Sequence, residues 1–87
     1  MIGNLVTSLA GHDKGHVYII VKVENDYCFL CDGHLRKMTT PKKKKLKHVQ
    51  LIKKEYDSIL KNRICSNDCT IRDEEIKRAI KLYIKSL

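Results

Sequence analysis

The first part of the chain alternates apolar and polar positions with the period of short β-strands. Residues 4–9 alternate in this way, and residues 17–23 are dense in β-branched side chains, which favour strands. Between them, residues 10–16 contain two glycines and an aspartate, which predicts a tight turn. The predicted core face of the second strand consists of Val17, Ile19, Val21 and Val23, opposite Lys22.

Further strand signals follow. Residues 27–31, "YCFLC", end at Asp32 and Gly33, a strong hairpin signal, so residues 35–38 are expected to return as the next strand. Residues 39–47, "TTPKKKKLK", are expected to form a loop because proline lacks an amide donor, and residues 49–52 resume a strand. Five short strands joined by tight turns predict a small closed or half-closed β-barrel.

The last third of the chain changes to the period of a helix. Apolar and charged residues there occupy opposite faces, which predicts an amphipathic helix over residues 71–86, with Thr70 as its N-cap. Residues 53–65 are expected to be a connector that can hold a short helical turn. The predicted fold is therefore mainly β with a C-terminal helix. Residues 1–54 form the barrel, and residues 55–87 form the connector and a helix that packs on the barrel or extends from it. Ile76, Ile80 and Ile84 are the expected packing residues.

The net charge of +8 changes this picture because it is distributed unevenly. Residues 1–54 contain 11 Lys or Arg against 4 Asp or Glu, whereas residues 55–87 contain 7 against 6. No acidic residue occurs in residues 33–54. Such a basic segment favours a polyanionic partner, either nucleic acid or an anionic membrane surface.

The turn between the first two strands resembles a known motif. With a strand on each side, "AGHDKG" is similar to the KOW motif of ribosomal proteins and transcription elongation factors. Residues 4–52 most resemble the KOW-type large-subunit ribosomal proteins of archaea and eukaryotes. The resemblance implies an SH3-like five-stranded barrel whose first loop contacts RNA, with Gly11 and Gly15 shaping the loop and Lys14 facing the RNA backbone. Many KOW motifs have a further glycine shortly after the position of Gly15, where this chain has residues 17–19, "VYI", so its second strand is expected to run straighter. An ordinary hairpin without a partner is the alternative interpretation.

The run "PKKKKLKH" supplies cations that can follow a phosphate backbone without reading its sequence. It is also compatible with a solvated loop, a nuclear import signal or a membrane-surface contact. Arg36 is the side chain best suited to a bidentate contact. Tyr18, Tyr27 and Phe29 could form a base-stacking platform, although packing is the more common role of such residues. The expected RNA-binding residues are Lys14, Arg36, Lys37, Lys42, Lys43, Lys44, Lys45 and Lys47, with His12, His16 and His48 as weaker candidates.

The sequence offers no arrangement typical of an enzyme or of a cofactor site. No nucleophile, base and orienting group can be aligned, and no phosphate-binding glycine fingerprint is present. Cys28 and Cys31 lie on a predicted strand and should point to opposite faces, far in sequence from Cys65 and Cys69. We therefore expect buried filler and surface thiols and neither a metal nor a cofactor, with a zinc-stabilised module as the alternative.

Together these features predict a non-enzymatic RNA-binding protein. It should be cytoplasmic and not bound to membranes, because a signal peptide and a long apolar run are both lacking. The resemblance further implies a ribosome-associated role in translation, with structured ribosomal RNA as the partner. The alternative is an SH3-like interaction module whose barrel and C-terminal helix bind a protein.

Overall fold

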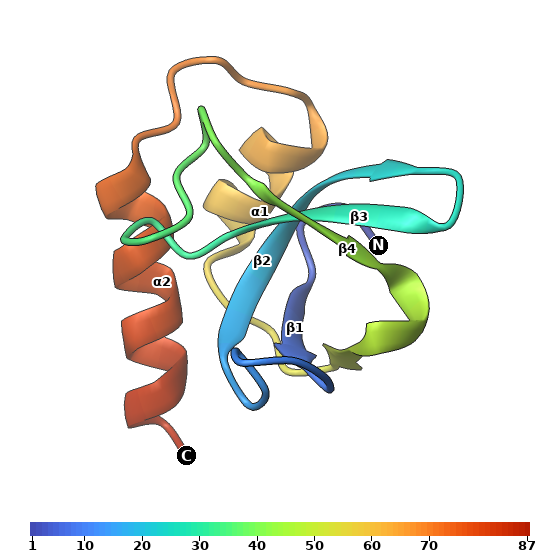
Figure 1. Ribbon diagram of the computed structural model, residues 1–87. Helices are drawn as coiled ribbons and strands as arrows, with labels where there is room; N and C mark the ends of the chain where they lie inside the picture. Colours follow the sequence, from blue (N-terminus) through green and yellow to red (C-terminus); the bar gives the residue numbers. More distant parts are fainter.

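The computed structural model describes residues 1–87, which fold into a five-stranded antiparallel sheet flanked by two helices (Figure 1). The sheet order is β4-β3-β2-β1-β5, which confirms the predicted antiparallel strands with a C-terminal helix. The edge strands β4 and β5 do not pair with each other, so the expected barrel is not closed. The strands are β1 (Leu5–Ser8), β2 (Val17–Glu24), β3 (Tyr27–Cys31), β4 (Lys42–Lys45) and β5 (Val49–Ile52). The helices are α1 (Ser58–Cys65) and α2 (Asp73–Lys85), and a 3-10 turn η1 (Leu46–His48) joins β4 to β5.

The strand β2 is buried on both faces over Tyr18, Ile19 and Ile20, which explains the apolar sequence of its first half. On one face Ile19 packs in a core cluster with residues of both helices, and on the other Tyr18 and Ile20 pack in a second cluster. The predicted core face is correct as far as Val21. Val23 joins the second cluster instead, because the register with β3 shifts after Ile20 and a bulge exchanges the faces of a strand.

The helices cover the first cluster. Ile76 and Ile80 of α2 are buried there as expected, whereas Ile84 is 50% exposed. The helix α1 contributes Leu60 and Ile64, so the connector contains a full short helix. Figure 1 shows α2 lying alongside the sheet. Neither helix has the length and apolar character that a membrane span needs.

Two predictions about the segment after β3 are wrong. Residues 35–38 are not a strand: Asp32 N–H donates to the Arg36 carbonyl at 2.9 Å, which closes a turn and leaves Leu35 73% exposed. Residues 39–47 are not a loop, because Lys42–Lys45 is the edge strand β4, paired with β3. Pro41 directly precedes this strand, a position that needs no amide donor.

The predicted cap of the C-terminal helix is also wrong. The helix α2 begins at Asp73 with Arg72 as its N-cap, and the Glu75 carboxylate accepts the Arg72 N–H at 3.3 Å. The side chain of Thr70 instead donates to Asp68 in the preceding turn. Arg63 of α1 pairs with Asp68 at 2.9 Å and also with Glu75, which connects the two helices.

Candidate nucleic-acid interface

The connection between β1 and β2 is a tight loop that requires two glycines. Gly11 and Gly15 have φ of +85° and +87°, in the left-handed region that other residues rarely adopt. The Gly15 N–H donates to the Ser8 carbonyl at 2.8 Å, which closes the loop at its base. Lys14 is exposed between the two glycines and is free to contact a ligand.

Asp13 is the centre of this loop. Its carboxylate accepts hydrogen bonds from Lys42 Nζ at 2.8 Å and Lys44 Nζ at 2.9 Å. Tyr18 Oη at 2.8 Å and Ser8 Oγ at 2.9 Å donate to it as well. Burial alone would raise the pKa of Asp13, but these four donors, the two lysines foremost, outweigh burial and hold the pKa well below its usual range. The charged carboxylate therefore fixes the loop to β4.

The four consecutive lysines have two different roles because they form a strand. Side chains alternate across a strand, so Lys42 and Lys44 turn towards Asp13 while Lys43 and Lys45 are exposed on the other side. The Lys44 side chain is only 10% exposed, and its ammonium also donates to the Ala10 carbonyl at 2.9 Å. Among these four lysines, only Lys43 and Lys45 form no ion pair with an acidic side chain and remain available as phosphate contacts.

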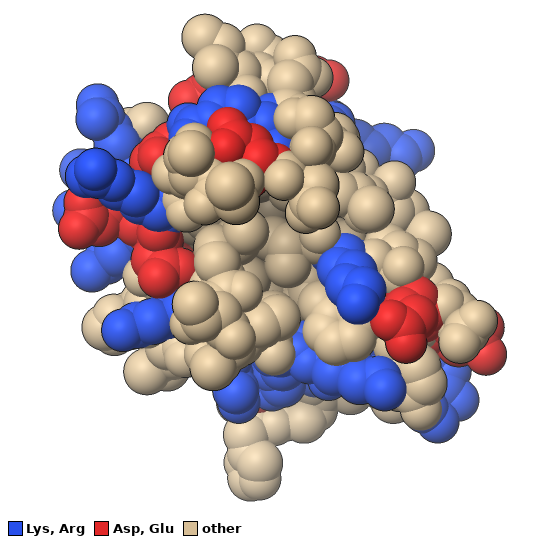
Figure 2. All heavy atoms as spheres, turned by 90° about the horizontal axis from the view of Figure 1, so that it is seen from above, with Lys and Arg blue, Asp and Glu red and all other residues tan.

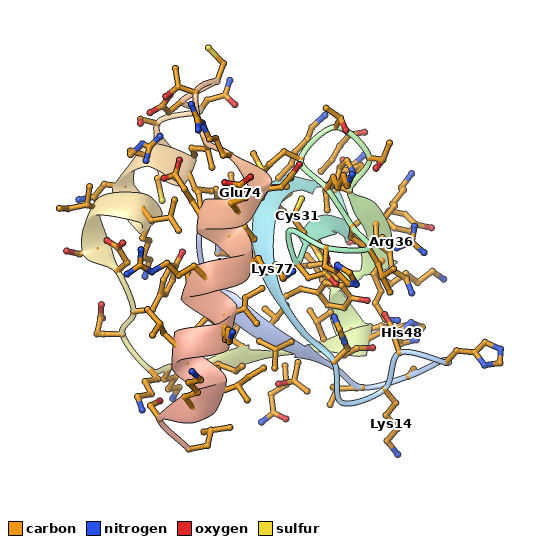
Figure 3. The ribbon with its side chains drawn as sticks, turned by 90° about the vertical axis from the view of Figure 1, so that its left-hand side faces the viewer. Lys14, Cys31, Arg36, His48, Glu74 and Lys77 are labelled. Atoms are coloured by element: carbon orange, nitrogen blue, oxygen red, sulfur yellow. The ribbon has the colours of Figure 1, made fainter.

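Most other predicted RNA-binding residues lie on elements next to the glycine loop and β4. We call the edge formed by the glycine loop (residues 10–16), residues 36–37, β4 and η1 the rim. Arg36 and Lys37 are exposed in the β3–β4 connection, and Lys47 is exposed in η1. The Leu9 N–H donates to the His48 carbonyl at 2.8 Å, which brings η1 to the base of the glycine loop. Figure 3 shows Lys14, Arg36 and His48 on one side of the molecule. Figure 2, seen from the end of the molecule away from Lys14, shows basic side chains along its lower edge and at its left, where acidic side chains lie among them. His12 is exposed at the tip of the glycine loop.

His16 is held by an acidic partner. Its Nε2 lies 2.8 Å from Asp32 Oδ2, and its ring centroid lies 4.6 Å from that of Tyr18. Asp32 also accepts the backbone N–H groups of His34 and Arg36, each at 2.9 Å. Burial would raise the pKa of Asp32, but these hydrogen bonds lower it below its usual value. The loop after β3 is thereby fixed beside the end of the glycine loop.

The three aromatic candidates are separated by the sheet. Tyr18 is buried in the second core cluster. Tyr27 and Phe29 lie on the opposite side of β3 from buried Cys28, and each faces a lysine: Lys43 Nζ is 4.4 Å from the Tyr27 ring centroid, and Lys22 Nζ is 5.2 Å from that of Phe29. Of the three aromatic candidates, only these two rings beside β4 are therefore placed to form a stacking surface.

The cysteines do not converge. Cys28 and Cys31 lie in different core clusters on opposite faces of β3, while Cys65 and Cys69 are exposed. Burial raises the pKa of the Cys31 thiol to about 12. No three His, Cys, Asp or Glu side chains form a cluster that could hold a metal ion.

Sequence reasoning missed the role of Asp13 and a second set of cations on α2. The sequence did contain a signal for the second set, because Lys77, Lys81 and Lys85 recur every fourth residue on a predicted helix. A scan against models of protein families and a search of curated proteins both find no match to this chain.

Proposed function

We propose that the protein is a non-enzymatic RNA-binding module of the SH3-like KOW type, which contacts the phosphates of structured RNA. The observation that carries the proposal is that Asp13 joins the glycine loop to β4 through hydrogen bonds from Lys42 and Lys44. This connection places Lys14, Lys43 and Lys45 on adjacent elements, and none of the three forms an ion pair within the chain. Unpaired cations on a rigid scaffold favour an external anion.

The spacing of the cations suits a phosphate backbone. Lys43 and Lys45 are two strand residues apart, roughly 7 Å, and both project from the same side of β4. Lysine is a point charge, so these contacts would supply affinity and position without reading bases. Arg36 offers the planar fork that can bind one phosphate or one guanine edge with two hydrogen bonds.

The strand arrangement supports the KOW-type part of the proposal. Each strand pairs with the next along the chain from β1 to β4, and β5 returns to the free side of β1. One face of the sheet has its own core cluster, against which Leu46 and Val49 also pack, and such a cluster is compatible with a partly open barrel. The resemblance of "AGHDKG" to the KOW loop then favours ribosomal RNA as the partner.

A salt titration tests the proposal. The variant Lys43→Gln/Lys45→Gln should bind an RNA hairpin with a log-log salt slope that is shallower by about 2 units, since each lost phosphate contact removes about 0.9. The matched control is Lys53→Gln/Lys61→Gln, which removes the same charge away from the rim and should leave the slope unchanged. Equal slopes for all three proteins would reject the rim as the RNA contact, and no binding by the wild type would reject the proposed function.

A further inference from the structure

A second cationic site lies between α2 and the ends of two loops. It is a groove of about 570 Å³ bounded by residues 15–17, residues 32–34 and one side of α2. Its apolar floor is formed by Val17, Ile80 and Ile84. Its polar lining has one acidic residue, Asp32, and otherwise consists of His16, His34, Lys77, Lys81 and Lys85.

The three lysines form a regular row. Positions four residues apart lie on the same side of an α-helix and are separated by about 6 Å along its axis. Lys77, Lys81 and Lys85 are exposed, and none forms an ion pair within the chain. The only acidic residue in the lining, Asp32, is 6% exposed and already accepts hydrogen bonds from His16 and two backbone N–H groups. The groove therefore presents positive charge above an apolar surface.

The groove continues the proposed RNA-binding rim. Residues 32–36 connect the two, since His34 lines the groove and Arg36 belongs to the rim. At the other side, His16 of the groove follows directly after the glycine loop that carries Lys14. Figure 3 shows Lys77 on the face of α2 that lies beside the loop of Arg36. A single polyanion can thus contact the groove and the rim at the same time.

We propose that this groove binds an unpaired stretch of the RNA whose structured part contacts the rim; the inference rests on the proposed function. The three lysines would contact consecutive phosphates, and the floor of Val17, Ile80 and Ile84 would cover an unstacked base or ribose. A duplex buries its base faces, so it offers nothing apolar to this floor, whereas unpaired nucleotides expose bases that pack on side chains. The imidazole of His34 borders the same space and suits stacking or hydrogen bonding to a base, whereas that of His16 is held by Asp32 and packs against Tyr18.

Two RNA probes separate this inference from the proposed function: a blunt hairpin, and the same hairpin with a single-stranded extension of about six nucleotides. The groove variant is Lys77→Gln/Lys81→Gln/Lys85→Gln. Its control is Lys53→Gln/Lys61→Gln/Arg78→Gln, which removes the same charge elsewhere, since Arg78 lines the other side of α2.

We expect the extension to strengthen binding to the wild type, and the groove variant to lose this gain, roughly 10- to 100-fold near 0.15 M salt. The salt slope of the groove variant with the extended RNA should become shallower by about 2 units, because each of the three lost single-strand phosphate contacts removes about 0.7. Binding of the blunt hairpin should change less than about twofold.

The apolar floor gives a second, independent measurement. Ile84 is 50% exposed, so Ile84→Ser should fold normally and can be checked by circular dichroism. It should weaken binding of the extended RNA only, with an unchanged salt slope, because no phosphate contact is removed.

Each alternative result has a distinct meaning. If the wild type binds both RNAs and the groove variant matches its control, the inference is overturned while the proposed function stands. If the wild type binds neither RNA, the proposed function fails and the inference fails with it. If a poly-glutamate peptide binds and loses affinity in the groove variant while RNA binding is unaffected, the groove belongs to an acidic protein partner and the inference is overturned.

Discussion

Replacing Gly33 with alanine is expected to destabilise the protein by roughly 3 kcal/mol. The left-handed conformation contributes about 1–2 kcal/mol of this loss, and overpacking contributes about 1–3 kcal/mol. The φ of Gly33 is +76°, and a Cβ there would lie 2.1 Å from the Asp73 carbonyl oxygen and 2.6 Å from the Lys77 amide nitrogen. Both atoms belong to the backbone of α2, so they cannot rotate away, and the helix must shift. Urea unfolding followed by circular dichroism would measure the loss, which corresponds to a lower Tm by about 12–24 °C.

Gly15→Ala is the matched control. Gly15 has a similar φ of +87°, but a Cβ there would meet no atom within 4 Å. This variant should lose only the conformational part, about 1–2 kcal/mol. Equal losses for Gly15→Ala and Gly33→Ala would contradict the close approach of the loop to α2.

The contact at Gly33 also bears on binding. Gly33 lies between Asp32 and His34, which line the groove, and it touches α2 at the turn that carries Lys77. The contact between the backbone of Gly33 and the backbone of α2 therefore sets the distance between the two walls of the groove. A glycine after a strand is readable in the sequence as a turn signal, but its approach to a helix about 40 residues later is not.

Elements with a strong period were predictable from the sequence, and those without one were not. The strands β2 and β3 and the helix α2 each show a clear repeat or β-branched content, and each lies close to its predicted residues. The strand β4 consists of four identical lysines, so no alternation is visible although the structure imposes one. The helix α1 buries only Leu60 and Ile64, too few positions to indicate a face.

The candidate site was predictable in composition but not in arrangement. The basic residues and the glycine loop are evident from the sequence, and the structure does bring the loop and the lysine run together. Whether a given lysine faces outward depends on its strand register, which is fixed by pairing with β3. Lys42 and Lys44 thus became partners of Asp13, and the free cations of the rim are fewer than the sequence suggests.

Replacing Asp13 with asparagine is expected to lower the free energy of unfolding at pH 7 by about 3 kcal/mol, as for other buried ion pairs that lose one partner. The shape of the side chain is kept, but the ammonium groups of Lys42 and Lys44 then face a neutral amide, and Lys44 is only 10% exposed. The double variant Asp13→Asn/Lys44→Met should recover part of the loss, because it removes one of the buried charges left without a counter-ion. Urea unfolding of the wild type, both single variants and the double variant would measure this coupling, and strict additivity would contradict it.

The pH dependence separates the charge of Asp13 from its hydrogen bonds. The pKa of Asp13 is lower in the folded protein than in the unfolded chain, so its contribution is complete above about pH 5 and declines as the pH falls below about 4. Below that value the stability difference between wild type and Asp13→Asn should shrink by about 1.4 kcal/mol per pH unit. A difference that stays constant from pH 7 to pH 2 would mean that Asp13 acts through the geometry of its hydrogen bonds alone. In that case the hydrogen bonds that hold Lys42 and Lys44 against the glycine loop would not depend on the charge of Asp13.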